Sequence, residues 1–187
     1  MKYFQLFIIA VFFTFSPASN AFPIPDDNEV SFDVIRKNKV IGNLTSKFIK
    51  DDENIVIHSV LDINIKILFI PAYKFFQETK ETWRNGEFIS IDGFTDFEDD
   101  REYKIDGKDE DGVFRVTGMD GLLELDEKII PLNYWNKNIL DEKELFDTQK
   151  GIVRKITVKK LKDEKIKINN SKLLSEKYTF NATKKKK

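Results

Sequence analysis

Residues able to do chemistry are few in this chain. His58 is the only histidine among 187 residues, and cysteine is absent. A zinc site built from histidine and cysteine needs more than one such ligand. A Ser-His-Asp triad through His58 is formally possible, but the sequence has no Gly-x-Ser-x-Gly elbow to present the serine. We therefore interpret His58 as a structural or solvated side chain, and the sequence predicts no catalytic residue and no metal site.

Two acidic clusters invite a calcium interpretation. They occupy residues 96–100 and residues 106–111, and Gly112 follows the second cluster. An EF-hand loop begins with an acidic ligand and has a bidentate Glu at its twelfth position. Here those two positions are Gly107 and Gly118, so we predict solvated loops, with an adventitious ion site as the alternative. A paired-carboxylate glycosidase also stays open, because such a pair is recognised by distance and not by spacing.

Four aromatic side chains are candidates for lining a ligand groove, namely Phe75, Trp83, Tyr134 and Trp135. Aromatic rings offer a large apolar surface, and Tyr and Trp add a polar edge that would orient a ligand. The same properties suit aromatic residues of a core or its rim that bind nothing, and this alternative stays open. No cofactor is expected.

Much of the chain shows the two-residue alternation that is typical of strands. From Ile55 to Phe69 apolar residues share one face with only Ser59 interrupting, which is typical of half-exposed β-structure. At about 3.3 Å per residue this run would span roughly 50 Å as one strand, so we expect it to bend or break. Tyr73 to Trp83 also alternates. The following Asn85-Gly86 predicts a two-residue hairpin turn, since both positions of such a turn need positive φ.

The complete pattern predicts a mainly β protein with a curved antiparallel meander sheet, either a half-barrel or a barrel, of about ten short strands. Gly42 is expected to mark a bulge or a close backbone approach. At most one short helix is expected, near residues 141–147. Asp141 would be its N-cap, with Glu144 three residues later.

The N-terminus has the features of a secretory signal peptide. Lys2 supplies a positive charge, Tyr3 to Phe15 is apolar, and Ser19 and Ala21 occupy the −3 and −1 positions before Phe22. We therefore predict a leader over residues 1–21, cleaved between Ala21 and Phe22, and a periplasmic or extracellular location. The apolar run is shorter than a transmembrane helix, which favours a cleaved leader over an anchor. Stable membrane insertion after cleavage is not expected, because the longest later apolar run, Ile63 to Ala72, is interrupted by Asn64 and Lys66.

The remainder is expected to form a single β domain over residues 22–180, followed by a disordered lysine-rich tail over residues 181–187. The absence of cysteine excludes a bacterial lipoprotein anchor, which needs an acylated cysteine at the cleavage site, and it also excludes a disulfide scaffold. The 31 basic and 32 acidic residues nearly cancel, so the chain lacks the overall positive field that favours nucleic-acid binding.

Four stretches together resemble a family of uncharacterised secreted bacterial proteins: Phe32-Asp-Val34 with Ile41-Gly42, Glu81-Thr-Trp-Arg-Asn-Gly86, Pro131-Leu-Asn-Tyr-Trp-Asn136, and Leu145-Phe-Asp-Thr-Gln-Lys-Gly151. The family has no established activity or catalytic residues to carry over. The opening pattern also resembles half-barrels of the periplasmic lipoprotein-carrier type, a likeness of fold that does not establish function. Family members continue past the region of Tyr178 with further strands, so this chain is expected to be either truncated or a short member.

The function that fits these observations is the binding or carriage of an apolar or lipid-like molecule by a soluble, non-enzymatic protein. The motivation is the apolar alternation from Ile55 to Phe69 together with secretion without an anchor. One alternative is a structural or protein-interaction module whose apolar faces are simply its core. A second is a hydrolase whose site cannot be read from the sequence. The oligomeric state stays open.

Overall fold

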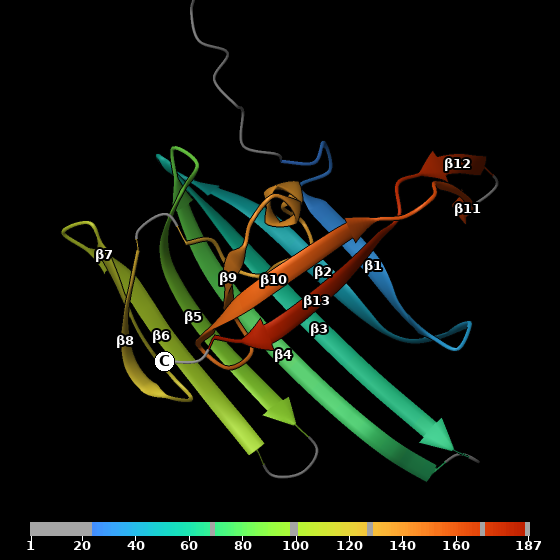
Figure 1. Cartoon of the computed structure of the whole chain (residues 1–187), viewed down its shortest axis with the longest axis horizontal. Coiled ribbons are helices and arrows are strands. Elements are labelled where there is room, and N and C mark those ends of the chain that lie inside the picture. Colours follow the sequence, from blue (N-terminus) through green and yellow to red (C-terminus); the bar gives the residue numbers. More distant parts are fainter. Residues whose placement is uncertain (1–23, 68–69, 98–100, 127–128, 169–170, 186–187) are drawn as a thin grey trace, which may run out of the picture.

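One large sheet dominates the computed structural model, which describes residues 24–67, 70–97, 101–126, 129–168 and 171–185 (Figure 1). Its eight antiparallel strands each pair with the next along the chain. They are β1 (Glu29–Arg36), β2 (Lys39–Asp51), β3 (Asn54–Ile67), β4 (Ile70–Arg84), β5 (Glu87–Phe97), β6 (Arg101–Glu110), β7 (Val113–Gly118) and β8 (Gly121–Asp126). The predicted mainly β fold and meander are confirmed. Since β1 and β8 are the two edges of the sheet, it is an open, curved half-barrel.

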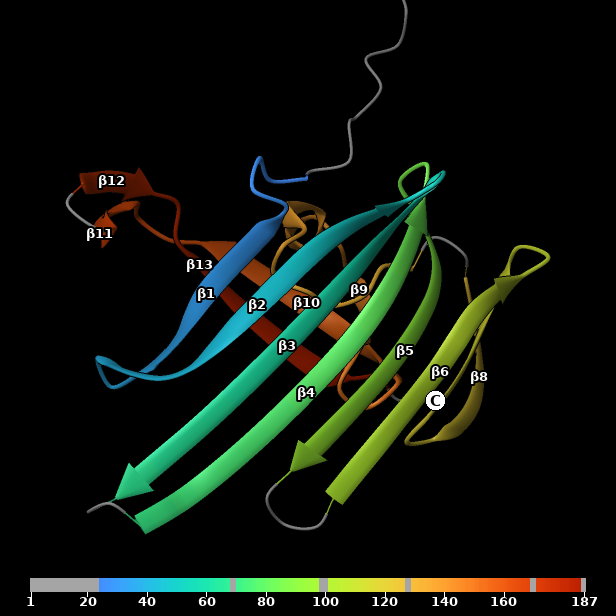
Figure 2. The same cartoon turned by 180° about the vertical axis from the view of Figure 1, so that it is seen from behind.

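The long alternating run is one continuous strand. β3 pairs with β4 along its whole length, with one register shift between Ile65 and Lys66. Both strands curve along the sheet (Figure 2), which agrees with the expected bend. At the other end of β4, φ is 52° at Asn85 and 84° at Gly86. The predicted two-residue hairpin turn is therefore confirmed.

Gly42 lies where β2 has no room for a side chain. A Cβ atom at this position would lie 2.2 Å from the carbonyl oxygen of Asp62 on β3. The register of β1 against β2 also shifts beside it, between Val34 and Ile35. Both expected features, the bulge and the close backbone approach, are present, and glycine is the residue that permits them.

A second sheet of three strands crosses the concave side of the large one (Figures 1 and 2). Its order is β13 (Tyr178–Lys184), β10 (Ile152–Lys160) and β9 (Glu144–Asp147). Between β10 and β13 the chain forms a separate hairpin of β11 (Glu164–Ile168) and β12 (Ser171–Ser175). The large sheet is therefore covered on its inner side by residues from the last third of the described chain.

The helix predicted near residues 141–147 does not form. The chain makes one 3-10 turn at Lys137–Leu140 and then enters β9. The reason is tertiary: the backbone N–H of Phe146 donates to Ile130 O at 3.0 Å, and its carbonyl accepts from Leu132 N at 2.7 Å. These bonds and the pairing with β10 outweigh the weak local preference for helix.

The prediction of a disordered tail over residues 181–187 is wrong for its first part. Residues 181–184 belong to β13 and continue its pairing with β10, with Ala182 opposite Ile156. Ala182 packs against the buried cluster that contains Ile156, and this contact extends the domain beyond residue 180. The predicted signal peptide at residues 1–21 and the last two lysines lie outside the described residues.

The described residues form an apolar core with two parts. The larger lies between the inner face of the large sheet and β9, and it contains Phe48, Ile57, Trp83, Phe88, Ile91, Ile105, Phe114, Val116 and Phe146. The smaller lies beneath the second sheet and contains Ile139, Leu145 and Ile156.

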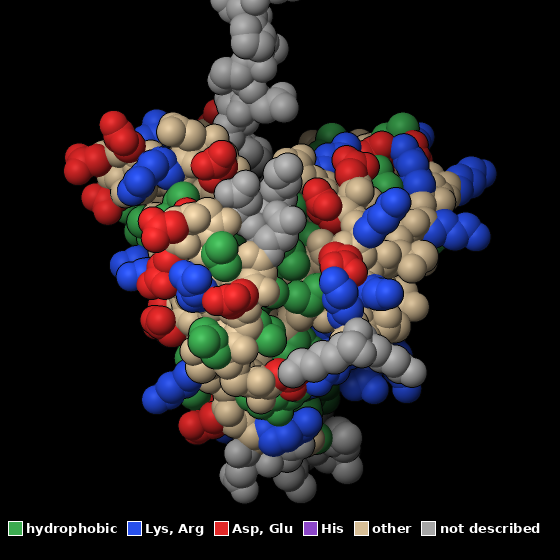
Figure 3. Space-filling model, turned by 60° about the vertical axis from the view of Figure 1, so that its left-hand side comes forward, with side chains coloured by type: hydrophobic (Ala, Val, Ile, Leu, Met, Phe, Trp, Pro, Cys, Tyr) green, Lys and Arg blue, Asp and Glu red, His purple; other side chains and the backbone are tan. Residues whose placement is uncertain are grey.

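On the side of β7 and β8, a hollow of about 150 Å³ separates β8 from β10 and β13. Figure 3 shows this side, with hydrophobic side chains between two lobes and charges of both signs around them.

Candidate functional site

The inner face of the large sheet has two halves that differ in chemistry. Over β5–β7 it is mainly apolar, with Thr95 of β5 as a buried polar exception. We call this part the aromatic half: Phe88, Ile91, Ile105, Phe114 and Val116. Over β2–β4 it carries buried polar side chains, and we call this part the polar half: Ser46, Ser59, Gln77, Thr79 and Glu81. Polar groups are rarely buried without a partner or a purpose, so the polar half is the candidate site.

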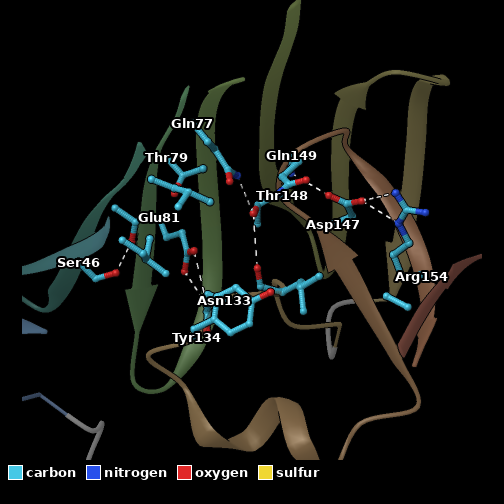
Figure 4. A pocket seen from close by; sticks show the side chains of 15 residues that line it. Ser46, Gln77, Thr79, Glu81, Asn133, Tyr134, Asp147, Thr148, Gln149 and Arg154 are labelled. Atoms are coloured by element: carbon cyan, nitrogen blue, oxygen red, sulfur yellow. Dashed lines mark hydrogen bonds and ion pairs between the residues drawn. The ribbon is translucent and has the colours of Figure 1, made fainter. Parts of the chain in front are cut away.

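A cavity of about 280 Å³ lies between the polar half and the segments that cover it (Figure 4). All five side chains of the polar half line it, together with Leu44 and Leu61 of the same sheet. The opposite wall includes Leu132, Asn133, Tyr134, Asp147, Arg154 and Ala182. Its volume is close to the lower end of small-molecule pockets, about 300 Å³.

The alternation of β4 explains how polar side chains reach this cavity. Successive residues of a strand point to opposite faces. Every second side chain from Phe75 to Trp83 is buried, whereas Glu78 and Lys80 between them are exposed. The row therefore begins and ends with an aromatic residue and has three polar residues in its middle. The alternation in the sequence correctly predicts that all five residues of this row share one face.

Glu81 is the most unusual of the three, because its side chain is only 1% exposed. Its Oε2 accepts hydrogen bonds from Trp83 Nε1 at 3.0 Å and from Asn133 Nδ2 at 3.2 Å. The same Asn133 nitrogen lies 3.5 Å from Oε1. Burial raises the pKa of Glu81 to about 7, and the two donors offset only part of that effect. The cavity thus contains a carboxyl group that changes charge near neutral pH.

Two further hydrogen bonds hold the polar half in place. The hydroxyls of Ser46 and Ser59, which are opposite each other on β2 and β3, lie 2.7 Å apart. Gln77 Nε2 donates to Thr148 Oγ1 at 3.1 Å, which ties β4 to the turn after β9. These contacts orient the side chains that face the cavity (Figure 4).

An ion pair between the buried Asp147 and the half-buried Arg154 is part of the opposite wall. Nε and Nη2 of Arg154 on β10 both lie 2.7 Å from Asp147 Oδ2 at the end of β9. The other oxygen of Asp147 accepts from Gln149 N at 2.8 Å. Because its charge is compensated by the guanidinium and a backbone N–H, Asp147 can be buried at a modest free-energy cost. This pair fixes the turn that carries Thr148 and Gln149 into the cavity lining.

The structure divides the four predicted groove residues. Tyr134 lines the cavity and remains 59% exposed. Trp83 is buried in the core, where it makes an edge contact with Trp135 at a centroid distance of 5.4 Å. Phe75 is buried beside the cavity and packs edge-on against Phe97 at 5.0 Å. Tyr134 is thus the member of this set that faces the cavity, while Trp83 positions Glu81 through its indole N–H.

Sequence reasoning missed the polar residues of the site. The signal was present in the alternation: Gln77, Thr79 and Glu81 share a face with Phe75 and Trp83, which are large apolar residues suited to a core. Polar residues on the apolar side of a strand contradict simple burial, and they indicate hydrogen bonding or function.

The other candidates from the sequence lie elsewhere. His58 is on the outer face of β3, where its Nε2 lies 2.6 Å from Glu78 Oε1. In the second acidic cluster, Asp109 caps the β6–β7 turn by accepting from Gly112 N at 3.0 Å. Within the described ranges no group of three or more His, Cys, Asp or Glu side chains is placed to hold a metal ion. Residues 98–100 of the first acidic cluster lie outside them.

No helix in the described part of the chain has the length and apolar content needed to cross a bilayer.

No curated protein and no solved structure matches the chain. A family model described as Domain of unknown function (DUF6134) matches residues 32–187, which include every residue of the cavity. The chain therefore belongs to this family.

Proposed function

We propose that this protein binds and carries a small amphipathic, lipid-like molecule in the cavity between its two sheets, without changing it chemically. The observation that carries the proposal is the cavity of about 280 Å³ with buried polar groups on one wall and aliphatic groups beside them. The location proposed with it is the periplasm or the outside of the cell, because residues 1–21 have the features of a signal peptide.

Packing alone does not account for this cavity. Protein interiors are close-packed, and both cavities and buried polar groups lower stability. In the aromatic half, the same sheet is tightly packed, with the stacked rings of Phe88 and Phe114 at a centroid distance of 4.6 Å. A ligand that fills the volume and hydrogen-bonds to the polar half gives those residues a role that folding does not require.

The mixed lining is the reason for proposing an amphipathic ligand. Leu44 and Leu61 are opposite each other on β2 and β3 and border the polar half. Beyond Leu61 the same face of β3 continues with Ile63 and Ile65, which are half-buried. An alkyl chain would lie along this aliphatic strip of Leu44, Leu61, Ile63 and Ile65, with its polar end in the cavity.

The proposal is tested by native mass spectrometry of the protein purified from its own host. We expect a non-covalent adduct with the mass of an amphipathic molecule. Thr79→Leu places a larger apolar side chain in the cavity and should remove most of that adduct. Lys80→Leu is the matched control, because the next side chain of β4 points to the outer face, and it should retain the adduct.

Two outcomes would contradict a carrier that binds its ligand in this cavity. One is equal loss of the adduct in Thr79→Leu and Lys80→Leu, which would place the ligand outside the cavity. The other is a wild-type protein that carries nothing and takes up no alkyl probe. The second outcome would favour a structural or interaction module with a purely architectural interior.

Hydrolysis is a second candidate, and one observation favours it. A carboxyl group with a pKa of about 7, such as Glu81, suits a general acid or base. Its hydrogen-bond partners, however, are an indole and a side-chain amide, and neither is a nucleophile. We expect wild type and Glu81→Gln to leave p-nitrophenyl octanoate equally intact. A wild-type rate that falls by about a hundredfold in the variant would establish the enzyme instead.

A further inference from the structure

Glu81 has acceptor capacity that the protein does not fill. An ionised carboxylate has about four lone-pair sites for hydrogen bonds. Here Oε2 receives two donors, whereas Oε1 has one contact at 3.5 Å, from a nitrogen already bonded to Oε2. The side chain is almost completely buried, yet it lines the cavity. A donor placed in the cavity would complete the hydrogen bonding of this carboxylate.

The charges around the cavity are unequal. Its charged side chains are Glu81, Asp147 and Arg154. Arg154 and Asp147 neutralise each other at 2.7 Å, while Glu81 has no cationic side chain within ion-pair distance among the described residues. When Glu81 is ionised, the cavity therefore has one uncompensated negative charge, and a cation entering it would be attracted.

We infer that Glu81 anchors the polar end of the ligand, and that this end is a protonated primary amine. The inference rests on the proposed binding function and names the chemical class of its ligand. A hydroxyl group would bind second best, since it donates one hydrogen bond without a charge. Carboxylates and phosphates would bind worst, because an anion would lie against the buried carboxylate.

The residues that face Glu81 are apolar on the sheet and polar on the side of the segments that cover it. On the neighbouring strands, Ile57 and Ile91 are opposite Glu81 and are apolar. The segment that covers this part of the sheet contributes Asn133, which does not titrate, and Tyr134, whose pKa is raised by desolvation and by the negative charge of Asp147. With the pKa of Glu81 at about 7, preference for a cation should grow as pH rises through neutrality.

Calorimetric titration with three probes of equal chain length tests this inference: octylammonium, octan-1-ol and octanoate. At pH 8.5 we expect octylammonium to bind about tenfold tighter than octanoate, with octanol between them. At pH 5.5 the same wild-type protein should lose most of this preference. Neither charged probe changes its dominant form between these pH values, so the change would report on the protein.

Two variants locate the effect. Glu81→Gln keeps the shape and an acceptor oxygen, and it should remove the preference for octylammonium at pH 8.5. Glu78→Gln removes an exposed carboxylate from the outer face of the same strand and should leave the preference unchanged. Thermal unfolding of both variants would confirm that they fold.

The outcomes separate the two proposals. Octanoate binding as tightly as octylammonium in wild type, or an unchanged preference in Glu81→Gln, would overturn the inference while leaving a carrier in place. Failure of all three probes to bind would overturn the carrier function as well. The wild-type comparison between the two pH values needs no variant, so the inference is testable even if Glu81→Gln is unstable.

Discussion

The aromatic half and the polar half lie on one face of one sheet and are buried by the same covering segments, yet they are built differently. In the aromatic half, Phe114 stacks on Phe88 and also contacts Phe146 of the cover. In the polar half, hydrogen-bonded side chains surround a cavity. From this difference we expect the aromatic half to supply most of the stability of the inner face, and it is the reason for proposing the polar half as the binding site.

The largest expected effect comes from breaking the aromatic half. Phe114→Ala removes a fully buried ring and should lower the free energy of unfolding by about 3–5 kcal/mol. Urea denaturation measures this loss. Phe32→Ala is the matched control, because that ring is 36% exposed on β1, and it should cost much less. Similar losses for both variants would mean that the aromatic half is not the main source of stability.

The second-largest expected effect is that Glu81→Gln stabilises the protein relative to wild type at high pH. The folded protein favours neutral Glu81, whose pKa rises from 4.5 to about 7. The folded state therefore binds this proton more tightly than the unfolded chain, and stability falls as pH rises from 4.5 through 7. The total loss is about 3 kcal/mol.

Glu81→Gln removes this titration, so its stability relative to wild type should increase between pH 5 and pH 8.5. Urea denaturation of both proteins at the two pH values measures the difference. A difference that stays constant with pH would show that Glu81 has an ordinary pKa and that the polar half is better hydrated than its burial indicates.

Substitutions at two glycines compare how tightly the two halves are packed, and their expected effects are smaller. A Cβ on Gly107 would lie 2.8 Å from the side chain of Val116 and 3.0 Å from Phe114, whereas a Cβ on Gly93 would lie 3.4 Å from Thr79. Gly107→Ala should therefore cost about 1–3 kcal/mol through overpacking. Gly93→Ala, next to the polar half, should have little effect. Thermal unfolding measures both, and the reverse order would contradict tight packing in the aromatic half.

The smallest expected effect concerns the hydroxyl pair of the polar half. Ser46→Ala leaves one buried hydroxyl without its partner at 2.7 Å and should cost about 1 kcal/mol. Adding Ser59→Ala removes the second hydroxyl, so the double variant should be no less stable than the single one. Urea denaturation of the set checks this. A double variant that loses the sum of two single losses would show that each serine stabilises the fold independently.

Local sequence predicted much of the large sheet because its signals are local. The alternation of β3 and β4 and the Asn85-Gly86 turn depend on neighbouring residues, and both are confirmed. The segments that cover the inner face of the large sheet were harder to predict. The strand at Glu144–Asp147 exists because Phe146 bonds to the backbone at 130 and 132, and this contact leaves no periodic signal in the sequence.

The candidate site was only partly predictable for the same reason. The face on which Glu81 lies follows from alternation, but its burial depends on Asn133, which is 52 residues away in the chain. Large aromatic side chains suit a core as well as a groove, and of the four proposed groove residues Tyr134 lies on the cavity. Polar residues on the apolar side of a strand are the more specific signal, and in β4 they are Gln77, Thr79 and Glu81.

The most direct test of a ligand site in the polar half is a crystal structure of the wild-type protein with octylammonium at pH 8.5. We predict that the ammonium nitrogen lies about 2.8 Å from Glu81 Oε1, with the alkyl chain directed toward Leu44 and Leu61. Octylammonium bound instead in the hollow between β8 and the β10–β13 pair, with only water beside Glu81, would contradict the assignment.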